Sequence, residues 1–366
     1  MTFKTNPPQR LLLINIFGIG DVLFTTPMIS NLKARYPDLY IGYLGNRRTA
    51  PILESNPKID KVFIFERDAL AEASKRSKPA VCRMLMDFIN SIRKERFDTS
   101  IDVSLSDLTG FISWMAGIKR RAGFKYKRRG FFLNRKCAFT GYEDRHVVDY
   151  YLGLLEALGV PVTTKELELF VSNEDNAWAG AFLLQNKRRL DGQRLIGMVP
   201  GGGASWGKDA QYKRWPPEKY AKLADYLIEK FSADIILFGD KSEVELCEAV
   251  AQGISRRPVL ACGETTVGQF AALARKCSLM VVNDGGPLHI AAAAGARTAS
   301  IFGPVDERVY GPYPKGNHIV IKKDIACRPC YRRFRRASCE HISCLSQLSV
   351  EEALSKIREI LDSLKF

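Results

Sequence analysis

Residues 283–295, which read N-D-G-G-P-L-H-I-A-A-A-A-G, have the types and spacing of a phosphate-binding turn. They follow an apolar run typical of a buried parallel strand, and they pass through Gly285 and Gly286 into an alanine-rich helix. Glycines let the backbone approach a ligand, and the N–H groups of a helix start favour an anion. The stretch therefore predicts a socket for a phosphate or diphosphate, with His289 as a further donor. The alternative is a tight turn in which Asp284 is the N-cap and His289 belongs to the core.

A second candidate for chemistry is Asp21, which follows an apolar run at 10–16 and a glycine turn at 17–20. Open α/β sheets bind ligands at the carboxyl ends of their central strands, so Asp21 is a candidate catalytic carboxylate. The alternative is that it only caps the helix predicted at 21–35. The turn does not match a dinucleotide fingerprint, because Leu23 stands where the third glycine belongs.

Residues 119–136 form a basic segment, in which nine of eighteen residues are Lys or Arg and the aromatic residues are Phe124, Tyr126, Phe131 and Phe132. Cations interleaved with aromatic rings suit a lipid headgroup surface or a phosphorylated lipid, and equally single-stranded nucleic acid. The alternative is a solvated loop. The four cations that we expect to face an anionic acceptor or a membrane are Arg120, Arg121, Arg128 and Arg129.

Four of the nine cysteines crowd into the last fifth of the chain, at Cys327, Cys330, Cys339 and Cys344. Their spacing is compatible with a structural zinc site, although the second pair is not a C-x2-C pair. The alternative is reduced thiols or labile disulfides in a surface excursion. The other five are expected to be reduced residues of the core, namely Cys82, Cys137, Cys247, Cys262 and Cys277.

Length and composition indicate a globular protein with an anionic partner. A chain of 366 residues with 46% apolar residues suggests two domains with ample core. The net charge of +15 favours phosphorylated glycolipid, an acidic membrane surface or nucleic acid, although a generally basic proteome has the same effect. The apolar run near the N-terminus has no cleavage site after it, so we read it as the first strand and expect a cytoplasmic protein.

The elements that position these residues alternate between strand and helix, which predicts a parallel sheet covered on both faces. Strands are predicted at 10–16, 39–44, 61–65 and 99–103, and again at 195–199, 235–238, 259–261, 279–282 and 299–302. Helices are predicted at 21–35, 81–96, 145–158, 173–189, 216–231, 241–250 and 266–276, and from Ser349, which forms a capping box with Glu352. The pattern restarts after an interdomain connection at 190–193, with a second glycine-rich loop at 200–205.

Four motifs in this order resemble glycosyltransferase family nine, the bacterial heptosyltransferases of lipopolysaccharide core synthesis. They are G-D-V-L-x-T-x-P from Gly20, P-G followed by K-x-W-P at Lys213, F-G-x-x-x-x-E ending at Glu243, and N-D-x-G-P-x-H from Asn283. The resemblance spans nearly the whole chain. It implies the α/β GT-B fold, with two facing Rossmann-like domains and an interdomain cleft.

The resemblance also implies a role for each matching residue. Asp21 matches the general base, Lys213 a lysine on the donor phosphates, and Glu243 the residue that holds the nucleoside ribose. The donor-sugar and diphosphate loop matches at Asp284, Gly286 and His289. Further donor-binding positions are Gly20, Gly285 and, by a hydroxyl from the opposite loop, Ser205. Many relatives have Thr or Ser where this chain has Gly285 and Pro287, which puts one hydroxyl contact in doubt.

The domains that the resemblance implies are an acceptor-binding Rossmann-like domain, a linker region, a nucleotide-sugar-binding Rossmann-like domain and a C-terminal helix. Their predicted bounds are 1–172, 173–193, 194–348 with the cysteine-rich loop at 327–344, and 349–366.

The activity implied is transfer of a heptose or related sugar from a nucleoside diphosphate sugar, ADP-heptose, to the lipopolysaccharide inner core. We expect inversion at the anomeric carbon with no cofactor, because the sequence shows no acidic cluster of the magnesium-binding type. The expected partners are the donor, an anionic glycolipid acceptor and the inner face of the inner membrane, without nucleic acid. The competing hypotheses are another donor or acceptor in the same family, a nicotinamide oxidoreductase using the first glycine turn, and a nucleic-acid-binding protein.

Overall fold

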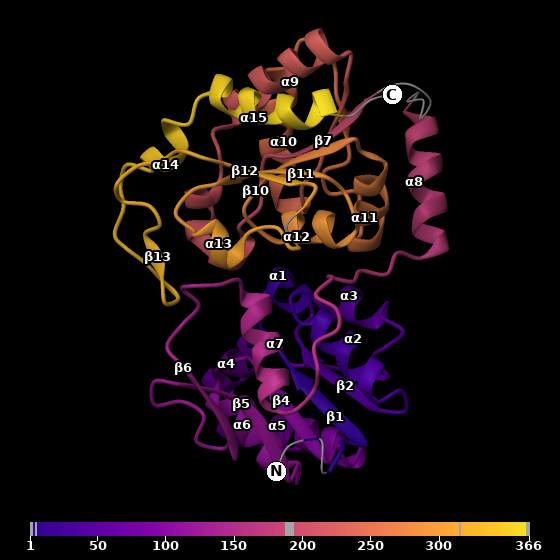
Figure 1. The fold of residues 1–366 in the computed structure, drawn as a ribbon, viewed down its shortest axis with the longest axis vertical. Coiled ribbons are helices and arrows are strands. Elements are labelled where there is room, and N and C mark those ends of the chain that lie inside the picture. Colours follow the sequence, from indigo (N-terminus) through magenta and orange to yellow (C-terminus); the bar gives the residue numbers. More distant parts are fainter. Residues whose placement is uncertain (1–2, 4–5, 187–193, 315, 364–366) are drawn as a thin grey trace. The chain divides into compact units, whose positions relative to one another are not determined.

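The computed structural model of the chain describes residue 3 and residues 6–186, 194–314 and 316–363. Its contacts divide the chain into two compact units, Met1–Glu166 and Leu167–Phe366. Each unit is built on one six-stranded sheet, and the ribbon in Figure 1 labels the elements. The connection predicted at 190–193 lies outside the described residues.

The sheet of the first unit has the strand order β3-β2-β1-β4-β5-β6, and all of its neighbours pair in parallel. Its central strands are apolar and buried, as expected for a parallel sheet covered on both faces. The strands are β1 (Arg10–Ile14), β2 (Tyr40–Gly45), β3 (Lys61–Ile64), β4 (Thr99–Asp102), β5 (Arg120–Tyr126) and β6 (Arg135–Phe139).

The helices of the first unit connect these strands. They are α1 (Ile19–Leu23), α2 (Thr26–Arg35), α3 (Ala50–Glu54), α4 (Arg67–Arg76), α5 (Lys78–Lys94), α6 (Asp107–Met115) and α7 (Val147–Ala157). The prediction of one helix over 21–35 is wrong, because the helix breaks between α1 and α2. Pro27 has no N–H to continue the ladder, and the hydroxyl of Thr25 donates to the carbonyl of Val22 at 2.7 Å.

The interpretation of the basic segment as a solvated loop is also wrong, because it contains all of β5 and the start of β6. Phe124 and Tyr126 alternate inward along β5 and are each only 5% exposed. These two rings therefore belong to the core and do not face an interface. Phe131, in the connection between the strands, is 79% exposed.

The sheet of the second unit has the order β12-β11-β10-β7-β8-β9, again with parallel pairing throughout. Its strands are β7 (Leu195–Val199), β8 (Asp234–Leu237), β9 (Val259–Leu260), β10 (Leu279–Asn283), β11 (Thr298–Phe302) and β12 (His318–Lys322). A short antiparallel pair, β13 (Tyr331–Arg332) and β14 (Arg335–Arg336), lies outside this sheet. Numbered within its own unit, each sheet has the strand order 3-2-1-4-5-6 of the Rossmann fold, which confirms the predicted fold class.

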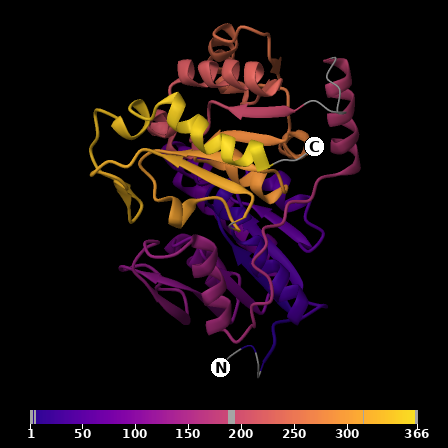
Figure 2. The ribbon, with the colours of Figure 1, turned by 45° about the horizontal axis from the view of Figure 1, so that its top comes forward.

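The helices of the second unit are α8 (Asn173–Gln185), α9 (Pro217–Phe231), α10 (Val244–Gln252), α11 (Val267–Lys276), α12 (Gly286–Ala293), α13 (Glu307–Tyr310), α14 (Ser343–Ser346) and α15 (Val350–Ser363), with 3-10 helices η1 (Ala204–Lys213) and η2 (Lys241–Glu243). The predicted capping box before α15 is confirmed, since Ser349 N–H donates to Glu352 at 2.8 Å and Glu352 N–H donates to Ser349 Oγ at 3.2 Å. Figure 2 shows α15, in yellow, lying along the sheet, where its apolar side joins the core.

In each sheet, the order in which successive strands are added reverses at one point. This point lies between β1 and β4 in the first unit and between β7 and β10 in the second. Loops at the carboxyl ends of these strands form the crevice in which open α/β sheets bind ligands. Asp21 follows β1, while the two glycine-rich loops follow β7 and β10. The topology thus places the predicted residues of each unit at the binding position of its own sheet.

The prediction that Cys247 and Cys262 are reduced is wrong, because their sulfur atoms form a disulfide. A side chain at Gly239 would meet both sulfurs, and the glycine leaves them room to approach. Cys82 is exposed and Cys137 is half-buried, so neither is the core residue that we expected, whereas Cys277 is free and buried. Among the described residues, no helix is long and apolar enough to cross a bilayer.

Candidate functional site

In the second unit, Asn283 joins the segments that form the predicted phosphate socket. Its side-chain amide donates to the carbonyls of Pro200 at 2.9 Å and Gly201 at 3.0 Å, and its oxygen accepts the N–H of Trp215 at 3.1 Å. Asn283 is the last residue of β10, and these partners lie after β7 and after η1. One buried amide therefore fixes both glycine-rich loops at the carboxyl ends of neighbouring strands.

The two loops approach each other so closely that a side chain at Gly285 would press on the backbone of the loop after β7. A Cβ atom built there would lie 3.1 Å from the backbone nitrogen of Gly203, which itself has a φ of +79°. Gly285 is also the N-cap of α12, so the prediction that Asp284 caps this helix is wrong. The first N–H groups of α12 are next to the loop after β7, an arrangement suited to an anion.

Asp284 instead forms a buried ion pair with Lys213, the last residue of η1. The Nζ atom of Lys213 lies 2.7 Å from Oδ2 of Asp284, and the two side chains are only 9% and 3% exposed. The same Nζ lies 4.5 Å from the centre of the Trp206 ring. The Lys213 ammonium is held between the Asp284 carboxylate and the Trp206 ring. It can bind a phosphate either by leaving Asp284 or by contacting both anions at once.

Glu243 is almost fully buried, and its carboxylate is engaged with the glycine-rich loop. Oε1 accepts the N–H of Gly202 at 2.7 Å and a guanidinium N–H of Arg214 at 2.8 Å, while Oε2 accepts the N–H of Asp240 at 3.1 Å. Arg214 also donates to the carbonyl of Gly202 at 3.0 Å. In this structure Glu243 positions the loop after β7, and a role in holding a ribose stays a prediction.

The remaining donor residues in the second unit lie around the same loops. Gly286 opens α12, and His289 lies one turn into it with an exposed fraction of 5%. Ser205 is exposed near the start of η1. Sequence reasoning missed Arg214 and Trp206, although both lie within a few residues of the K-x-W-P motif, and it gave no role to the amide of Asn283.

In the first unit, Asp21 lies in the first turn of α1 and is half-buried. The N-cap of α1 is Gly18, so Asp21 is not the cap of this helix. The turn is held by Asn15, whose amide donates to the backbone carbonyl of Asp21 at 3.0 Å and whose oxygen accepts the N–H of Phe17 at 3.0 Å. The carboxylate is thus carried on a fixed turn after β1. Gly20 precedes it in the same turn.

Three buried tyrosines lie near enough to Asp21 for its charge to affect them, and sequence reasoning missed them. The pKa values of Tyr43, Tyr142 and Tyr151 are raised, mainly by burial and additionally by the negative charge of Asp21. Tyr142 donates to the hydroxyl of Tyr151 at 3.3 Å, and the Tyr43 hydroxyl lies 2.8 Å from that of Thr25. These phenols therefore stay neutral, so that polar hydroxyl groups, and no additional negative charge, lie near the carboxylate of Asp21.

The four arginines predicted to face an acceptor do not form one patch. Arg120 and Arg121 begin β5, where Arg120 pairs with Asp98 and Arg121 donates to the carbonyls of Phe132 at 2.6 Å and Ile118 at 2.5 Å. Arg128 and Arg129 follow the other end of the strand and are both exposed. A strand rises by about 3.3 Å per residue, so the two pairs of arginines lie at opposite ends of β5.

An exposed aromatic cluster, which sequence reasoning missed in part, lies beside this segment. Trp114 at the end of α6 is 49% exposed, and its ring lies 5.8 Å from that of Phe132, which is 5.2 Å from Phe131. Asp107 fixes the connection by accepting the N–H groups of Gly130 at 2.8 Å and Phe131 at 3.2 Å. We call Trp114, Phe131 and Phe132 the aromatic cluster.

Comparison with known sequences gives a consistent set of relatives. The profile of glycosyltransferase family 9 (heptosyltransferase) matches residues 85–341. A lipooligosaccharide heptosyltransferase 2 from Campylobacter jejuni is 26% identical over 348 residues, which cover 94% of this chain and 95% of the relative. Lipopolysaccharide heptosyltransferase 2 from Escherichia coli K12 is 26% identical over 309 residues, or 81% of this chain and 83% of the relative.

Two solved structures have the same fold. A glycosyl transferase family 9 protein from Veillonella parvula superposes with a TM-score of 0.79 at 23% identity, covering 97% of this chain and 98% of the other. The ADP-heptose lipopolysaccharide heptosyltransferase II of Escherichia coli superposes with a TM-score of 0.73 at 21% identity, covering 97% and 99%. Together with the two six-stranded parallel sheets, these similarities show the GT-B fold.

Proposed function

The chain belongs to glycosyltransferase family 9, the heptosyltransferases, and we propose that it transfers a heptose from ADP-heptose to the inner core of lipopolysaccharide. Relatives over most of its length are heptosyltransferases of lipooligosaccharide and lipopolysaccharide. One structural relative is an ADP-heptose heptosyltransferase, and another Escherichia coli heptosyltransferase was solved with ADP. This likeness supports ADP as the donor nucleotide.

The observation that carries the proposal is the buried Lys213–Asp284 pair beside the two glycine-rich loops. A diphosphate leaving group needs positive charge and N–H donors that are in place before the bond breaks. Lys213 supplies the charge, and the start of α12 supplies N–H groups. We assign the donor sugar to Asp284 and His289, with Ser205 and Gly20 as further donor contacts. Glu243 positions the loop after β7, and a direct contact with the ribose is the alternative role that a Glu243→Gln variant tests.

We assign the acceptor chemistry to Asp21. Its carboxylate takes the proton of the acceptor hydroxyl as that oxygen attacks the anomeric carbon and ADP departs from the opposite face. The new bond therefore has inverted configuration. General-base assistance of this type is worth roughly 10²–10⁴-fold. Because Lys213 provides the positive charge at the diphosphate, the reacting centre needs no metal ion.

The acceptor in this proposal is an anionic glycolipid at the inner face of the inner membrane. The exposed Arg128 and Arg129 match its phosphates, and the aromatic cluster matches the interface between headgroups and acyl chains. Both belong to the unit that carries Asp21, which must meet the acceptor hydroxyl. We therefore propose a peripheral membrane enzyme.

The test is a transfer assay with purified protein, ADP-heptose and inner-core lipopolysaccharide that lacks heptose. We expect the acceptor to gain the mass of one heptose, with an inverted anomeric linkage by NMR. Calorimetric titrations with ADP, UDP and GDP should show the tightest binding for ADP. Tighter binding of UDP or GDP would indicate that the chain uses another donor nucleotide within the family. Absence of transfer from ADP-heptose or from a heptose donor with the preferred nucleotide would contradict the proposal.

A further inference from the structure

Between β12 and α15 the chain makes an excursion that we call the cysteine segment, residues 323–346. None of residues 323–343 is buried, and before α14 begins at Ser343 their regular structure is limited to the two-residue strands β13 and β14. Ordering a backbone costs about 1–2 kcal/mol per residue. A segment of this length without a core of its own needs another source of stability.

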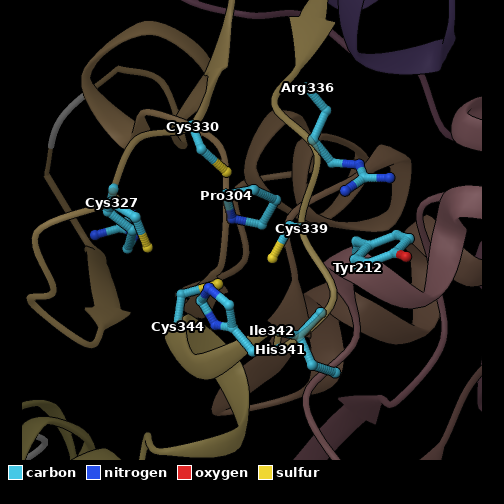
Figure 3. Close-up of a pocket in the computed structure, with 10 residues that line it drawn as sticks. Tyr212, Pro304, Cys327, Cys330, Arg336, Cys339, His341, Ile342 and Cys344 are labelled. Atoms are coloured by element: carbon cyan, nitrogen blue, oxygen red, sulfur yellow. The ribbon is translucent and has the colours of Figure 1, made fainter.

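The four cysteines of the segment line one pocket. Cys327 and Cys330 precede the β13–β14 hairpin, Cys339 follows it, and Cys344 lies in α14. Figure 3 shows their sulfur atoms pointing into the same space from three sides. The hairpin brings its two flanks together, since the N–H of Ala337 donates to the carbonyl of Cys330 at 3.1 Å. Residues that are well separated in the segment thus converge on one point.

The electrostatics of the pocket are those of clustered thiols facing cations. Arg328 and Arg336 line the same pocket. Four thiolates around a divalent ion carry a net charge of −2. The two guanidinium groups lie near this charge, although Arg328 also pairs with Glu307 at 3.1 Å and Arg336 with Asp209 at 3.6 Å.

The pocket rests on a fixed support. Arg328 donates to the carbonyl of Gly303 at 2.5 Å and to Glu307 at 3.1 Å, and the N–H of Cys330 donates to the carbonyl of Pro304 at 3.1 Å. The Nδ1 atom of His341, the other candidate ligand, lies 2.7 Å from Ser343 Oγ. This bond engages only Nδ1 and does not by itself remove His341 as a ligand. We take the four sulfurs as the ligand set because all four cysteines line the pocket and thiolates suit a thiophilic ion. As these side chains stand, no three described His, Cys, Asp or Glu groups are arranged to hold an ion, so the site must close on binding.

We propose that Cys327, Cys330, Cys339 and Cys344 bind one thiophilic divalent metal ion in a structural tetrathiolate site. Binding releases the thiol protons to solvent and requires no oxidant. Closing the site requires the sulfur atoms to approach one another within the pocket that the four cysteines already share. Zinc, which is held tetrahedrally by four thiolates in many structural sites, is the metal that this ligand set fits best and is the probe for the test.

The metal site would also support the donor loop. The Tyr331 ring of the hairpin lies 5.0 Å from Trp206, and the guanidinium of Arg336 lies 3.7 Å from the centre of the Tyr212 ring. Both aromatic residues belong to η1, which ends at Lys213. Loss of the ion should therefore loosen η1 and weaken ADP binding. This consequence alone rests on the proposed function.

The experiment measures metal content by mass spectrometry in the full-length protein, purified under reducing conditions with zinc present and then dialysed. We expect one zinc ion per chain, and a Co²⁺-substituted sample with the visible absorption of tetrahedral cobalt–thiolate coordination. Cys327→Ser, at the most exposed ligand, should lower zinc affinity at least tenfold while the chain stays folded by circular dichroism. Cys82→Ser, at an exposed cysteine outside the segment, should keep the ion.

Three results would overturn the metal site: a reduced chain that binds no zinc or cobalt, full zinc content in a Cys327→Ser, Cys330→Ser double variant, or disulfides among the four cysteines in the folded protein that persist under the reducing conditions of purification. ADP titration of the zinc-free chain then separates the two proposals. Zinc bound through the four thiols with no ADP binding would leave the metal site standing and contradict the proposed donor.

Discussion

The ammonium of Lys213 lies 2.7 Å from the carboxylate of Asp284, and both groups are buried at the carboxyl ends of neighbouring strands. A buried charge that loses its partner is strongly destabilising, by about 3–5 kcal/mol. The pair is thus part of the fold as well as of the candidate donor site. A test of Lys213 must separate these two contributions.

We predict that Lys213→Ala weakens ADP binding by about 1–3 kcal/mol, as expected for a lost charge-assisted contact, and also lowers the melting temperature. The double variant Lys213→Met, Asp284→Asn removes both charges and should regain most of the stability but not the affinity. Calorimetry and thermal unfolding measure the two effects. Lys208→Ala, at an exposed lysine of η1, is the control. Full ADP affinity in the double variant would move the donor site elsewhere.

A substitution at Asp21 should affect turnover more than binding. We predict that Asp21→Asn and Asp21→Ala lower kcat by roughly 10²-fold or more, because the acceptor hydroxyl loses its base, while ADP affinity changes only a few-fold. Steady-state transfer assays and calorimetry give the two quantities. Asp38→Asn, at an exposed aspartate of the same unit, should behave like the wild type. Turnover at the wild-type rate in either Asp21 variant would remove the assignment.

For Glu243, two roles predict different results. If it holds the ribose, Glu243→Gln should weaken ADP binding and leave inorganic pyrophosphate binding unchanged. If it mainly positions Gly202, both ligands should bind less tightly and the melting temperature should fall, because a buried carboxylate loses charge-assisted bonds to Gly202 and Arg214. We expect the second result, since both carboxylate oxygens are already engaged. Glu245→Gln, at an exposed position two residues further on, is the matched control.

The sequence predicted β1 to β4 and β7 to β11, because each of these strands is a short apolar run bounded by turn residues, but it missed β5, β6 and β12. It also predicted the loops after β7 and β10, since their glycines have a local signature. It did not predict the Lys213–Asp284 pair, because these two residues are distant in the chain. It also did not predict the Cys247–Cys262 disulfide, because the two cysteines, only 15 residues apart, have no spacing pattern that sets them apart from the other scattered cysteines. Nor did it distinguish Phe124 from Phe131, because only the pairing of β5 determines which ring is buried.

Transfer should proceed in the presence of EDTA. If Lys213 and the start of α12 carry the charge of the departing diphosphate, a chelator added during the assay should leave kcat unchanged. A brief exposure is needed, so that any ion in the cysteine segment stays bound, as checked by metal content after the assay. An absolute requirement for added magnesium in the chemical step would contradict the metal-independent mechanism.

The last prediction concerns the basic segment, whose arginines the structure separates. Arg128 and Arg129 are exposed next to Phe131, although Arg129 also donates to the carbonyl of Leu105 at 3.1 Å. Arg120 and Arg121 are less exposed and are held by Asp98 and by backbone carbonyls. Each cation near an anionic membrane is worth about 1 kcal/mol. We therefore predict that Arg128→Ser, Arg129→Ser weakens binding to vesicles of anionic lipid about tenfold or more and raises the acceptor KM, without changing ADP affinity.

The matched variant Arg120→Ser, Arg121→Ser removes the same number of positive charges from the opposite end of β5. It should lower the melting temperature, because Asp98 loses its partner, and it should bind vesicles more nearly like the wild type. Vesicle sedimentation at low and high salt measures the electrostatic contribution to membrane binding, because salt screens the attraction between the arginines and the anionic lipid. A third variant, Trp114→Ser with Phe131→Ser, tests the aromatic cluster and should weaken a salt-insensitive part of the binding. If all three variants bind vesicles and acceptor like the wild type, then the acceptor is recognised by another surface.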